Sequence, residues 1–494
     1  MYLWVTNSLK KRTKIIATLG PASESLQKIT ELIHAGVNVF RLNFSHGTYA
    51  YHSQILKNIR EASKQTGLIV GILQDISGPK IRIGELQESF ELKENDIVTF
   101  CKKDILGRRK DENSYEVSIN YPEILSRLHV DDYIYLYDGI IRTKVLTCNE
   151  DTVSVLVEND GILSSKKGIN FPNTRLDVDI LTQKDKDDMQ WGVQNGVDFM
   201  AISFVQNEQD MLKARMIVKN LGGKQMLIAK IEKFDAVENI DAILEISDGI
   251  MVARGDLGIE VPYYKIPNIQ KMLIQKANAA SKPVITATQM LLSMTNSPRA
   301  TRAEISDIAN AVLDGTDAVM LSEESAVGDY PVLAVKTMFE TIVQTEKLYP
   351  YYNFSHIYKD DVTNAIDESA VRLGRDLHVS GILSLTNSGS SARKLAKYRP
   401  SMPIYAITHD GIRRSQLTLS WGVIPVFFVE KGSLGQSLSR VINKGLESGI
   451  LNLKKSYILT AGDPTGVSGS INMIRLLREQ EMLFFKTINQ EPIV

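Results

Sequence analysis

The sequence predicts an α/β protein: a (β/α)8 TIM barrel, a small β-barrel lid domain inserted into it, and an open α/β domain at the C-terminal end. Eight short apolar runs alternate with amphipathic patterns of helical period, as in parallel strands that are covered on both faces. After the third run, strand-like segments and Asp-Gly turns interrupt the alternation. The alternation resumes beyond about residue 350, which indicates a third domain.

Composition and charge are those of an ordinary globular chain. Of 494 residues, 43% are hydrophobic and 23% are charged, and this length suggests roughly three domains of about 150 residues. Lysine and arginine total 57 against 58 acidic residues, so the net charge of -1 offers no basic excess for coating DNA or RNA. We therefore expect no nucleic-acid partner.

The N-terminal residues and the cysteines indicate a cytoplasmic protein. The first residues are apolar and basic residues follow, which is the reverse of a secretory signal. No stretch approaches the ~18 consecutive apolar residues of a membrane span, so we expect no membrane partner. Cys101 and Cys148, the two cysteines, lie far apart, which argues against a disulfide framework or a zinc knuckle and favours a reducing compartment.

The eight apolar runs are the predicted barrel strands, and eight such units favour a closed barrel over an open sheet. They occupy residues 14–20, 37–45, 68–75, 199–204, 226–232, 249–254, 283–289 and 318–323. The segments between them are predicted helices; one begins with a capping box of Thr301 and Glu304, followed by apolar residues at helical spacing. The catalytic barrel is thus assigned to residues 1–84 and 175–349.

The interruption, residues 85–174, is predicted to be a small all-β module inserted after the third barrel strand. Its strand-like runs, bounded by Asp-Gly and Asn-Asp-Gly turns, are 90–92, 96–101, 133–137 and 153–157. Residues 350–494 are predicted to form the open α/β domain. Its strand runs are 381–385, 403–407, 423–428 and 457–460.

In a barrel of this kind, an active site lies at the C-terminal ends of the strands. Polar or ionisable side chains follow six different strands there: Arg41, Asn43, Ser45, His46, Asp75, Lys80, Arg82, Lys230, Glu232, Arg254, Asp256, Thr288, Ser322 and Glu324. Any one of them alone is more often a helix cap or an ion-pair partner than a catalyst. The convergence of six strands on one rim is what predicts a site.

Glu232 and Asp256 are the natural pair of metal ligands. Carboxylates at two neighbouring strand ends, without a histidine or cysteine cluster nearby, suit a hard ion, Mg2+ or Mn2+. Lys230 lies two residues before Glu232, so both side chains point to the same face of the strand. A lysine there can neutralise an enolate or a phosphoryl group. The alternative is a lysine that only balances two acids.

Segment 254–258 places Gly255 and Gly258 around a strand-to-helix turn, where backbone amides can hold a carboxylate or a phosphate. Gly-Asp turns are common, so this pattern alone is a weak indication. The chain has no GxxxxGK[ST] motif, which excludes a P-loop as the means of holding a nucleotide.

Seven strings together resemble the pyruvate kinase family, from about Arg12 to the end of the chain and in the family's domain order. They are KIIATLGPAS at 14–23, RLNFSHG at 41–47, GPKIR at 78–82, IAKIE at 228–232, DGIMVARGDLGIE at 248–260, ATQM at 287–290 and RAEISDIANAV at 302–312. The resemblance implies a barrel, an inserted β lid and a C-terminal regulatory domain, in agreement with the periodicity. It also implies a homotetramer, with the helix from Thr301 in a subunit contact.

The resemblance implies transfer of a phosphoryl group from phosphoenolpyruvate to ADP, followed by protonation of the enolate of pyruvate. Glu232 and Asp256 match the family's divalent-metal ligands, and Lys230 matches the lysine that neutralises the phosphoryl group and the enolate. The amides of Gly255 and Asp256 and the hydroxyl of Thr288 match groups that hold the substrate carboxylate. Thr288 is also expected to relay the proton through water, because an alcohol is too weak an acid to donate unaided.

The resemblance assigns phosphate and nucleotide contacts as well. Arg41 and Arg82 match arginines that bind the transferring phosphate, where a guanidinium offers permanently charged, bidentate contacts. His46 matches a nucleotide contact, with a role as a loop cap as the alternative.

The lid is expected to contribute to the site when it closes and excludes water. Lys167 matches the lid lysine that binds the ADP phosphates, with Lys166 as the alternative. Asp138 matches an acid that the closed lid brings toward the site.

In the C-terminal domain, a cluster of small polar residues follows a strand and opens a helix, where hydroxyls and amides can cradle a phosphate. The cluster is Thr386, Ser388, Gly389, Ser390 and Ser391, and an ordinary N-cap cluster is the alternative. It resembles the family's sugar-phosphate effector loop, but Asn387 and Ser390 stand where some members carry a basic residue. We expect an effector with one phosphate, a sugar monophosphate or AMP, rather than fructose 1,6-bisphosphate.

Many members of the family bind K+ through groups that match Asn43, Ser45, Asp75 and the carbonyl of Ile76. Those members carry a glutamate where this chain has Lys80. We expect the ammonium of Lys80 to supply the positive charge that the glutamate otherwise recruits as a bound cation, because two cations in one small site repel each other. We therefore expect no potassium requirement. The alternative is that Lys80 points to solvent and the site still takes K+.

Two other functions stay open at this stage. A metal-dependent aldolase or lyase would use the Glu232–Asp256 pair but not Arg41, His46, Lys167 or a lid, so the presence of those features disfavours it. A catalytically silent scaffold predicts damage in the metal pair or at the neighbouring lysine, and all three residues are intact.

Overall fold

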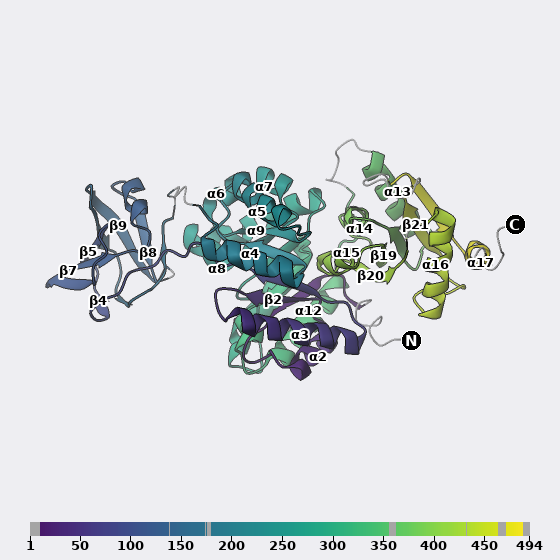
Figure 1. Cartoon of the computed structure of the whole chain (residues 1–494), viewed down its shortest axis with the longest axis horizontal. Coiled ribbons are helices and arrows are strands. Elements are labelled where there is room, and N and C mark those ends of the chain that lie inside the picture. The colour runs from purple at the N-terminus through teal and green to yellow at the C-terminus, as the bar shows by residue number, and fades with distance from the viewer. Residues whose placement is uncertain are drawn as a thin grey trace.

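The computed structural model describes residues 10–137, 139–172, 174, 179–354, 362–430, 432–462 and 471–487. The three parts lie in a row along the longest axis, with the all-β lid at one end, the barrel in the middle and the C-terminal domain at the other end (Figure 1). Within the described ranges, no helix combines the length and the apolarity that a membrane crossing requires.

The central part is a closed barrel of eight parallel strands in the order β1-β17-β16-β15-β14-β13-β3-β2. The strands are β1 (Lys14–Thr18), β2 (Val39–Asn43), β3 (Gly71–Asp75), β13 (Phe199–Ile202), β14 (Met226–Ile231), β15 (Gly249–Ala253), β16 (Val284–Ala287) and β17 (Ala318–Leu321). Closure comes from β1 and β17, where Lys14 lies opposite Ala318. All eight predicted strands are confirmed, because strands buried on both faces are continuous apolar runs.

Helices cover the outside of the barrel (Figure 1). They are α2 (Leu26–Ala35), α3 (Tyr49–Thr66), α4 (Gln183–Asn195), α5 (Glu208–Asn220), α6 (Phe234–Glu238), α7 (Ile240–Ile246), α8 (Arg254–Glu260), α9 (Ile266–Ala279), α10 (Arg302–Asp314), α11 (Glu323–Ala326) and α12 (Pro331–Glu346). The predicted capping box is confirmed at α10: the Thr301 hydroxyl accepts from the Glu304 amide at 3.2 Å, and the Glu304 carboxylate accepts from the Thr301 amide at 2.7 Å.

The lid consists of a seven-stranded sheet in the order β12-β8-β9-β10-β5-β7-β6 and a two-stranded ribbon of β11 and β4. Its strands are β4 (Phe90–Leu92), β5 (Ile97–Cys101), β6 (Arg108–Asp111), β7 (Ser114–Ser118), β8 (Tyr133–Leu136), β9 (Ile141–Cys148), β10 (Thr152–Val157), β11 (Gly161–Leu163) and β12 (Ile169–Asn170). The four predicted runs correspond to β4, β5, β8 and β10.

The chain crosses between barrel and lid twice, and the two crossings pair with each other. The Ile83 amide donates to the Lys167 carbonyl at 2.9 Å, and the Ile169 amide donates to the Ile81 carbonyl at 3.0 Å. We call these paired segments, residues 81–83 and 167–169, the neck.

The C-terminal domain has a five-stranded sheet in the order β20-β19-β18-β21-β22. Its elements are α13 (Val362–Asp376), β18 (Ile382–Leu385), α14 (Ser390–Ala396), β19 (Ile404–Thr408), α15 (Gly411–Gln416), β20 (Val423–Phe428), α16 (Leu434–Glu447), β21 (Tyr457–Ala461), β22 (Met473–Leu477) and α17 (Glu479–Thr487). The four predicted strands are confirmed. The pattern missed β22, which pairs antiparallel to β21 at the edge of the sheet.

Candidate active site

A buried cluster of two carboxylates and two cations lies at the C-terminal ends of β2, β3 and β14. Arg41 donates from Nε to Asp75 Oδ2 at 2.6 Å. The Nζ atom of Lys230 lies 3.2 Å from Asp75 Oδ1 and 2.8 Å from Glu232 Oε1. Asp75 and Glu232 are each 2% exposed, so these charges meet away from water. The cluster brings together four of the residues that the sequence singled out.

The cluster keeps Lys230 charged. Burial alone would lower the pKa of Lys230, but the carboxylates of Asp75 and Glu232 outweigh burial and raise that pKa above its ordinary value. Burial opposes ionisation of Asp75 as well, yet Lys230 and Arg41 hold the pKa of its carboxyl below the ordinary value. Lys230 is therefore a fixed positive charge at this face of the barrel, which suits the neutralisation of a developing anion.

Two hydroxyl groups complete the cluster, and the sequence reasoning missed both. Ser203, directly after β13, accepts from Lys230 Nζ at 2.7 Å and donates to the Ile76 carbonyl at 2.6 Å. Thr18, the last residue of β1, accepts from Arg41 Nη1 at 3.0 Å. Both residues end barrel strands, so the strand-end rule applied to the first and fourth strands would have found them.

Glu232 and Asp256 form an acidic pair. Burial raises the pKa of Glu232, Lys230 opposes the rise, and the negative charge of Asp256 adds to it. Among the described residues, no group of three or more His, Cys, Asp or Glu could hold a metal by itself. Because Mg2+ commonly uses one or two carboxylates and takes its other ligands from substrate and water, the pair fits an ion that binds together with a substrate.

Thr288 adopts a left-handed backbone conformation beside the start of α8. Its φ of 69° is rare for a β-branched residue and marks local strain. The Thr288 hydroxyl accepts from the Gly255 amide at 2.8 Å, and the Thr288 carbonyl accepts from Arg254 Nη2 at 2.8 Å. Arg254 also pairs with Asp307 at 2.7 Å. These contacts hold the strained turn and place the hydroxyl next to the Gly255 amide.

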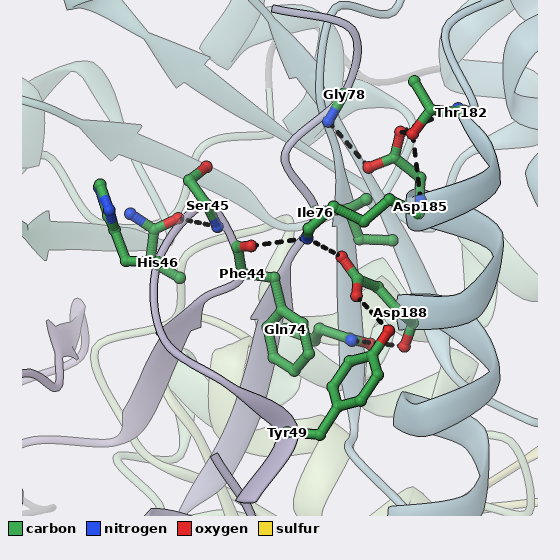
Figure 2. Close-up of polar contacts among 12 residues, drawn as sticks. Phe44, Ser45, His46, Tyr49, Gln74, Ile76, Gly78, Thr182, Asp185 and Asp188 are labelled. Atoms are coloured by element: carbon green, nitrogen blue, oxygen red, sulfur yellow. Dashed lines mark hydrogen bonds and ion pairs between the residues drawn. The ribbon is translucent and has the colours of Figure 1, made fainter. Parts of the chain in front are cut away.

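Two loops beside the cluster are tied to α4, as Figure 2 shows. Lys184 of α4 donates to the Phe44 carbonyl at 2.9 Å and pairs with Asp188 at 2.6 Å. The Gly78 amide donates to Asp185 of the same helix at 3.0 Å. Asp185 and Asp188 are buried, so α4 fixes the positions of the loops that follow β2 and β3.

The residues matched to a monovalent-cation site lie in these two loops. The Ser45 amide donates to Asn43 Oδ1 at 3.1 Å, and His46 follows in the same exposed loop (Figure 2). Asp75 and the Ile76 carbonyl already accept hydrogen bonds from the buried cluster.

Lys80 lies in a pocket of about 540 Å³ between the neck and the barrel rim. The lining includes Lys80, Ile81 and Asn170 on the lid side and Lys233 and Asp256 on the barrel side. The structure thus brings Lys80, which is exposed, to the same pocket as one member of the acidic pair.

The remaining candidates on the lid side stand outside the buried cluster. Arg82 donates from Nη1 to the Lys166 carbonyl at 2.9 Å, at the neck. The ammonium of Lys167 lies 4.0 Å from the centre of the Tyr137 ring. Asp138 lies outside the described residues.

Glu324 has a structural role in the wall of the barrel. Its carboxylate accepts from the amides of Leu291 and Ser322, at 3.0 and 2.7 Å, and the residue is 1% exposed. Glu324 and Ser322 therefore join two strand ends, in the structural role that a lone strand-end acid usually has.

The polar cluster of the C-terminal domain forms a tight loop between β18 and α14. The Thr386 hydroxyl accepts from the Gly389 amide at 3.0 Å, and the Ser388 hydroxyl accepts from the Ser390 amide at 3.4 Å. Arg393 of α14 donates to the Ser388 carbonyl at 3.3 Å. A basic side chain therefore lies beneath this loop, although none occurs within it.

Comparison with known proteins identifies the family. A family model of the pyruvate kinase barrel domain matches residues 10–335, and a model of the pyruvate kinase alpha/beta domain matches residues 364–477. The chain belongs to the pyruvate kinase family. Membership in the pyruvate kinase family makes the chain a phosphotransferase and agrees with the barrel and C-terminal α/β domain described above.

Individual pyruvate kinases match over nearly the whole chain. The pyruvate kinase of Geobacillus stearothermophilus is 41% identical over 476 residues, which are 95% of this chain and 80% of that protein. Pyruvate kinase 2 of Synechocystis sp. is 42% identical over 481 residues, with the same coverage of 95% and 80%. The crystal structure of a pyruvate kinase from Cryptosporidium parvum matches with a TM-score of 0.89 at 34% identity, covering 96% of this chain and 97% of that one.

Proposed function

We propose that the chain catalyses Mg2+-dependent transfer of a phosphoryl group from phosphoenolpyruvate to ADP, giving ATP and pyruvate, the final step of glycolysis. The observation that carries this proposal is the permanently charged Lys230, held among Asp75, Glu232 and Ser203 beside Arg41. A buried, preorganised cation stabilises charge that develops on the phosphoryl group and on the enolate left behind.

Each remaining candidate has a role in this reaction. Arg41 and Arg82 bind the transferring phosphate, while His46 and Lys167 contact the nucleotide. The substrate carboxylate replaces the present contact between Thr288 and Gly255, where it meets that hydroxyl and the amides of Gly255 and Asp256. Thr288 then relays a proton through water to the enolate carbon.

Glu232 and Asp256 are the proposed ligands of the divalent ion, Mg2+ or Mn2+. Such an ion, when bound, neutralises negative charge on the phosphate and on the enolate oxygen. Glu232→Gln removes one ligand charge, so we expect the Mg2+ concentration for half-maximal rate to rise about tenfold or more. Glu31→Gln, at a half-exposed position of α2, is the control. Unchanged metal dependence of Glu232→Gln would move the ligand role to another residue.

The test of the proposed reaction is an assay coupled to lactate dehydrogenase, with phosphoenolpyruvate and ADP, with and without Mg2+. We expect pyruvate to form only when both substrates and the ion are present. Pyruvate release that does not depend on ADP would favour the aldolase or lyase alternative. A folded chain without turnover would favour the scaffold.

We propose further that the enzyme does not require K+. Two observations support this: Lys80 shares a pocket with Asp256, and the Ile76 carbonyl already accepts from Ser203. Activity measured in tetramethylammonium salts at constant ionic strength should change little when K+ is added, and Lys80→Glu should create a K+ dependence. A rise of about an order of magnitude in the unmodified enzyme on adding K+ would refute the proposal.

Regulation and assembly complete the proposal. We propose a phosphorylated effector with a single phosphate at Thr386, Ser388, Gly389, Ser390 and Ser391, and a cytoplasmic homotetramer. Rates measured with sugar monophosphates, AMP and fructose 1,6-bisphosphate test the effector, and activation by the bisphosphate alone would contradict it. Sedimentation velocity tests the tetramer.

A further inference from the structure

A second pocket lies at the opposite end of the barrel from the candidate active site, between the barrel and the C-terminal domain. Its empty space, including the part open to solvent at its mouth, is about 210 Å³. The barrel contributes Lys282, just before β16, and Asp317, just before β17. The C-terminal domain contributes Arg393 of α14, Arg399 shortly after that helix, and Ser420 before β20. The pocket therefore joins two domains that are far apart in sequence.

Positive charge dominates the lining of this pocket. Lys282, Arg393, Lys397 and Arg399 line it together with a single carboxylate, Asp317. That carboxylate is engaged already: it pairs with Arg399 at 3.2 Å and accepts from the Trp421 amide at 3.0 Å. The cations of the lining thus outnumber the acids, and the two lysines are held by neutral acceptors: Lys282 donates to the Leu244 and Glu245 carbonyls, and Lys397 donates to Asn364 Oδ1.

Three hydrogen-bond donors at the pocket are buried without a partner among the described residues: Arg393 Nη1, Arg399 Nε and the Ser420 hydroxyl. A buried donor without a partner is costly, and a charged one more so. Burial lowers the pKa of Arg393 to about 10, although Asp248 opposes the change, and the charge of Arg413 lowers it further. Water could satisfy the donors but would leave the excess positive charge in place.

We propose that this pocket binds a small oxyanion, a phosphate or carboxylate group, between Arg393, Ser420 and Lys282. An oxyanion can accept hydrogen bonds from the unpartnered donors, and its negative charge can neutralise the guanidinium of Arg393. A ligand held by both domains stabilises their contact.

The pocket is separate from the loop at Ser388–Ser391, although Arg393 touches both. Arg393 Nη2 donates to the Ser388 carbonyl, while Arg393 Nη1 is the unpartnered atom. Ser420 and Lys282 line the pocket and come from outside the loop. Variants of these two residues therefore distinguish the pocket from the proposed effector loop.

The test measures the thermal midpoint of the full-length chain as inorganic phosphate is added at constant ionic strength. We expect a phosphate-dependent rise that is reduced about threefold or more in Arg393→Met, Lys282→Met and Ser420→Ala. Arg440→Met removes a distant arginine of the same domain and should respond like the unmodified chain. Phosphate that enters the active site contributes equally to all of these proteins and cancels in the comparison.

Ser420→Ala breaks no side-chain hydrogen bond among the described residues, so we expect it to stay folded. If Arg393→Met or Lys282→Met unfolds the chain, Ser420→Ala alone tests the proposal. Equal phosphate responses in the unmodified chain and Ser420→Ala would overturn the proposal. A response lost in Arg393→Met but kept in Ser420→Ala and Lys282→Met would assign the anion to the loop and also overturn it. A parallel titration with acetate shows whether a carboxylate alone suffices or a tetrahedral anion is needed.

Discussion

Lys230 is a buried lysine that its neighbours keep protonated. A lysine taken out of water normally tends to lose its proton, but here two buried carboxylates reverse that tendency and raise its pKa. The Ser203 hydroxyl fixes the ammonium further by accepting its hydrogen bond. Charge of this kind is ready before the substrate arrives, so no reorganisation is needed during the reaction.

Replacing Lys230 by methionine should leave a folded protein whose kcat is lower by about 100-fold or more, because the charge that stabilises the transition state is lost. The measurement is kcat in the coupled assay, with circular dichroism to verify folding. Lys213→Met, at an exposed position of α5, is the matched control and should keep its rate. Near-normal turnover by a stable Lys230→Met protein would remove Lys230 from the mechanism.

Which residues meet at the site could be predicted only in part. The strand-end rule placed Arg41, Asp75, Lys230 and Glu232 on one rim, because the topology of a barrel decides that much. The rule could not show that Asp75 contacts both cations, since contact depends on side-chain rotamers. The resemblance matches Asp75 to a potassium site, and the structure adds that its carboxylate pairs with both Arg41 and Lys230.

At the scale of elements, α10 illustrates a structure that the sequence specifies locally. Thr301 and Glu304 satisfy each other's backbone amides, and Glu304 also accepts from the amide and hydroxyl of Ser293, at 2.7 and 2.6 Å. The capping box therefore does two things: it starts the helix and ties it to the segment after β16.

Thr301→Ala should weaken the first turn of α10 by about 1 kcal/mol, since it removes the side-chain oxygen that accepts from the Glu304 amide. Amide hydrogen exchange near Glu304 should then accelerate about fivefold, while the barrel strands keep their protection. Thr301→Ser retains the hydroxyl and serves as the control. Equal exchange in Thr301→Ala and the unmodified chain would show that the cap contributes nothing.

Two of the strands that the sequence missed, β6 and β22, share a physical cause. Strand β6 (Arg108–Asp111) is fully exposed and reads RRKD, so it has no apolar side chain to form a pattern. Strand β22 (Met473–Leu477) lies at a sheet edge with most of its residues partly exposed, and it departs from the βα alternation that revealed its neighbours. Hydrophobic periodicity reveals a strand only where its side chains are buried. Backbone pairing is the main interaction that holds β6 and β22, and it leaves no such pattern in the sequence.

For the molecule as a whole, buried polar contacts join the barrel to the C-terminal domain. Arg399 pairs with Asp317 at 3.2 Å, and the Lys14 ammonium donates to the Val423 carbonyl of β20 at 2.7 Å. Burial lowers the pKa of Lys14 to about 7, and Arg12 lowers it as well, while Glu346 and Asp317 oppose the change. The interface therefore contains a lysine that titrates near neutral pH.

This lysine makes stability depend on pH in a defined window. Between about pH 7 and 10.5, Lys14 is neutral in the folded chain but protonated in the unfolded chain, so the unfolded state binds more protons and stability rises with pH. Below pH 7 both states are protonated, and the cost of burying the charge is fully present. Lys14 contributes at most about 1.4 kcal/mol per pH unit.

Lys14→Met should remove this contribution. Thermal midpoints measured from pH 6 to 9 should rise less steeply with pH in Lys14→Met than in the unmodified chain. Lys28→Met, at a half-exposed position of α2, provides the control for loss of a lysine. Parallel pH profiles in all three proteins would mean that Lys14 keeps its ordinary pKa.

The insertion of the lid within the barrel has a consequence for how the chain is made. Strand β1 pairs on one edge with β17, which is synthesised roughly three hundred residues later, so that edge of β1 stays unpaired until β17 has been made. The core of the lid runs from Ile81 to Phe171, so it is complete long before that moment. At roughly 5–20 residues per second, synthesis of the intervening chain takes on the order of 15–60 s. For about the second half of that time the lid core is complete, while β1, β2 and β3 can pair only with one another. The outer edges of β1 and β3 then stay open and apolar, so the nascent barrel is a stage at which we expect a chaperone to help.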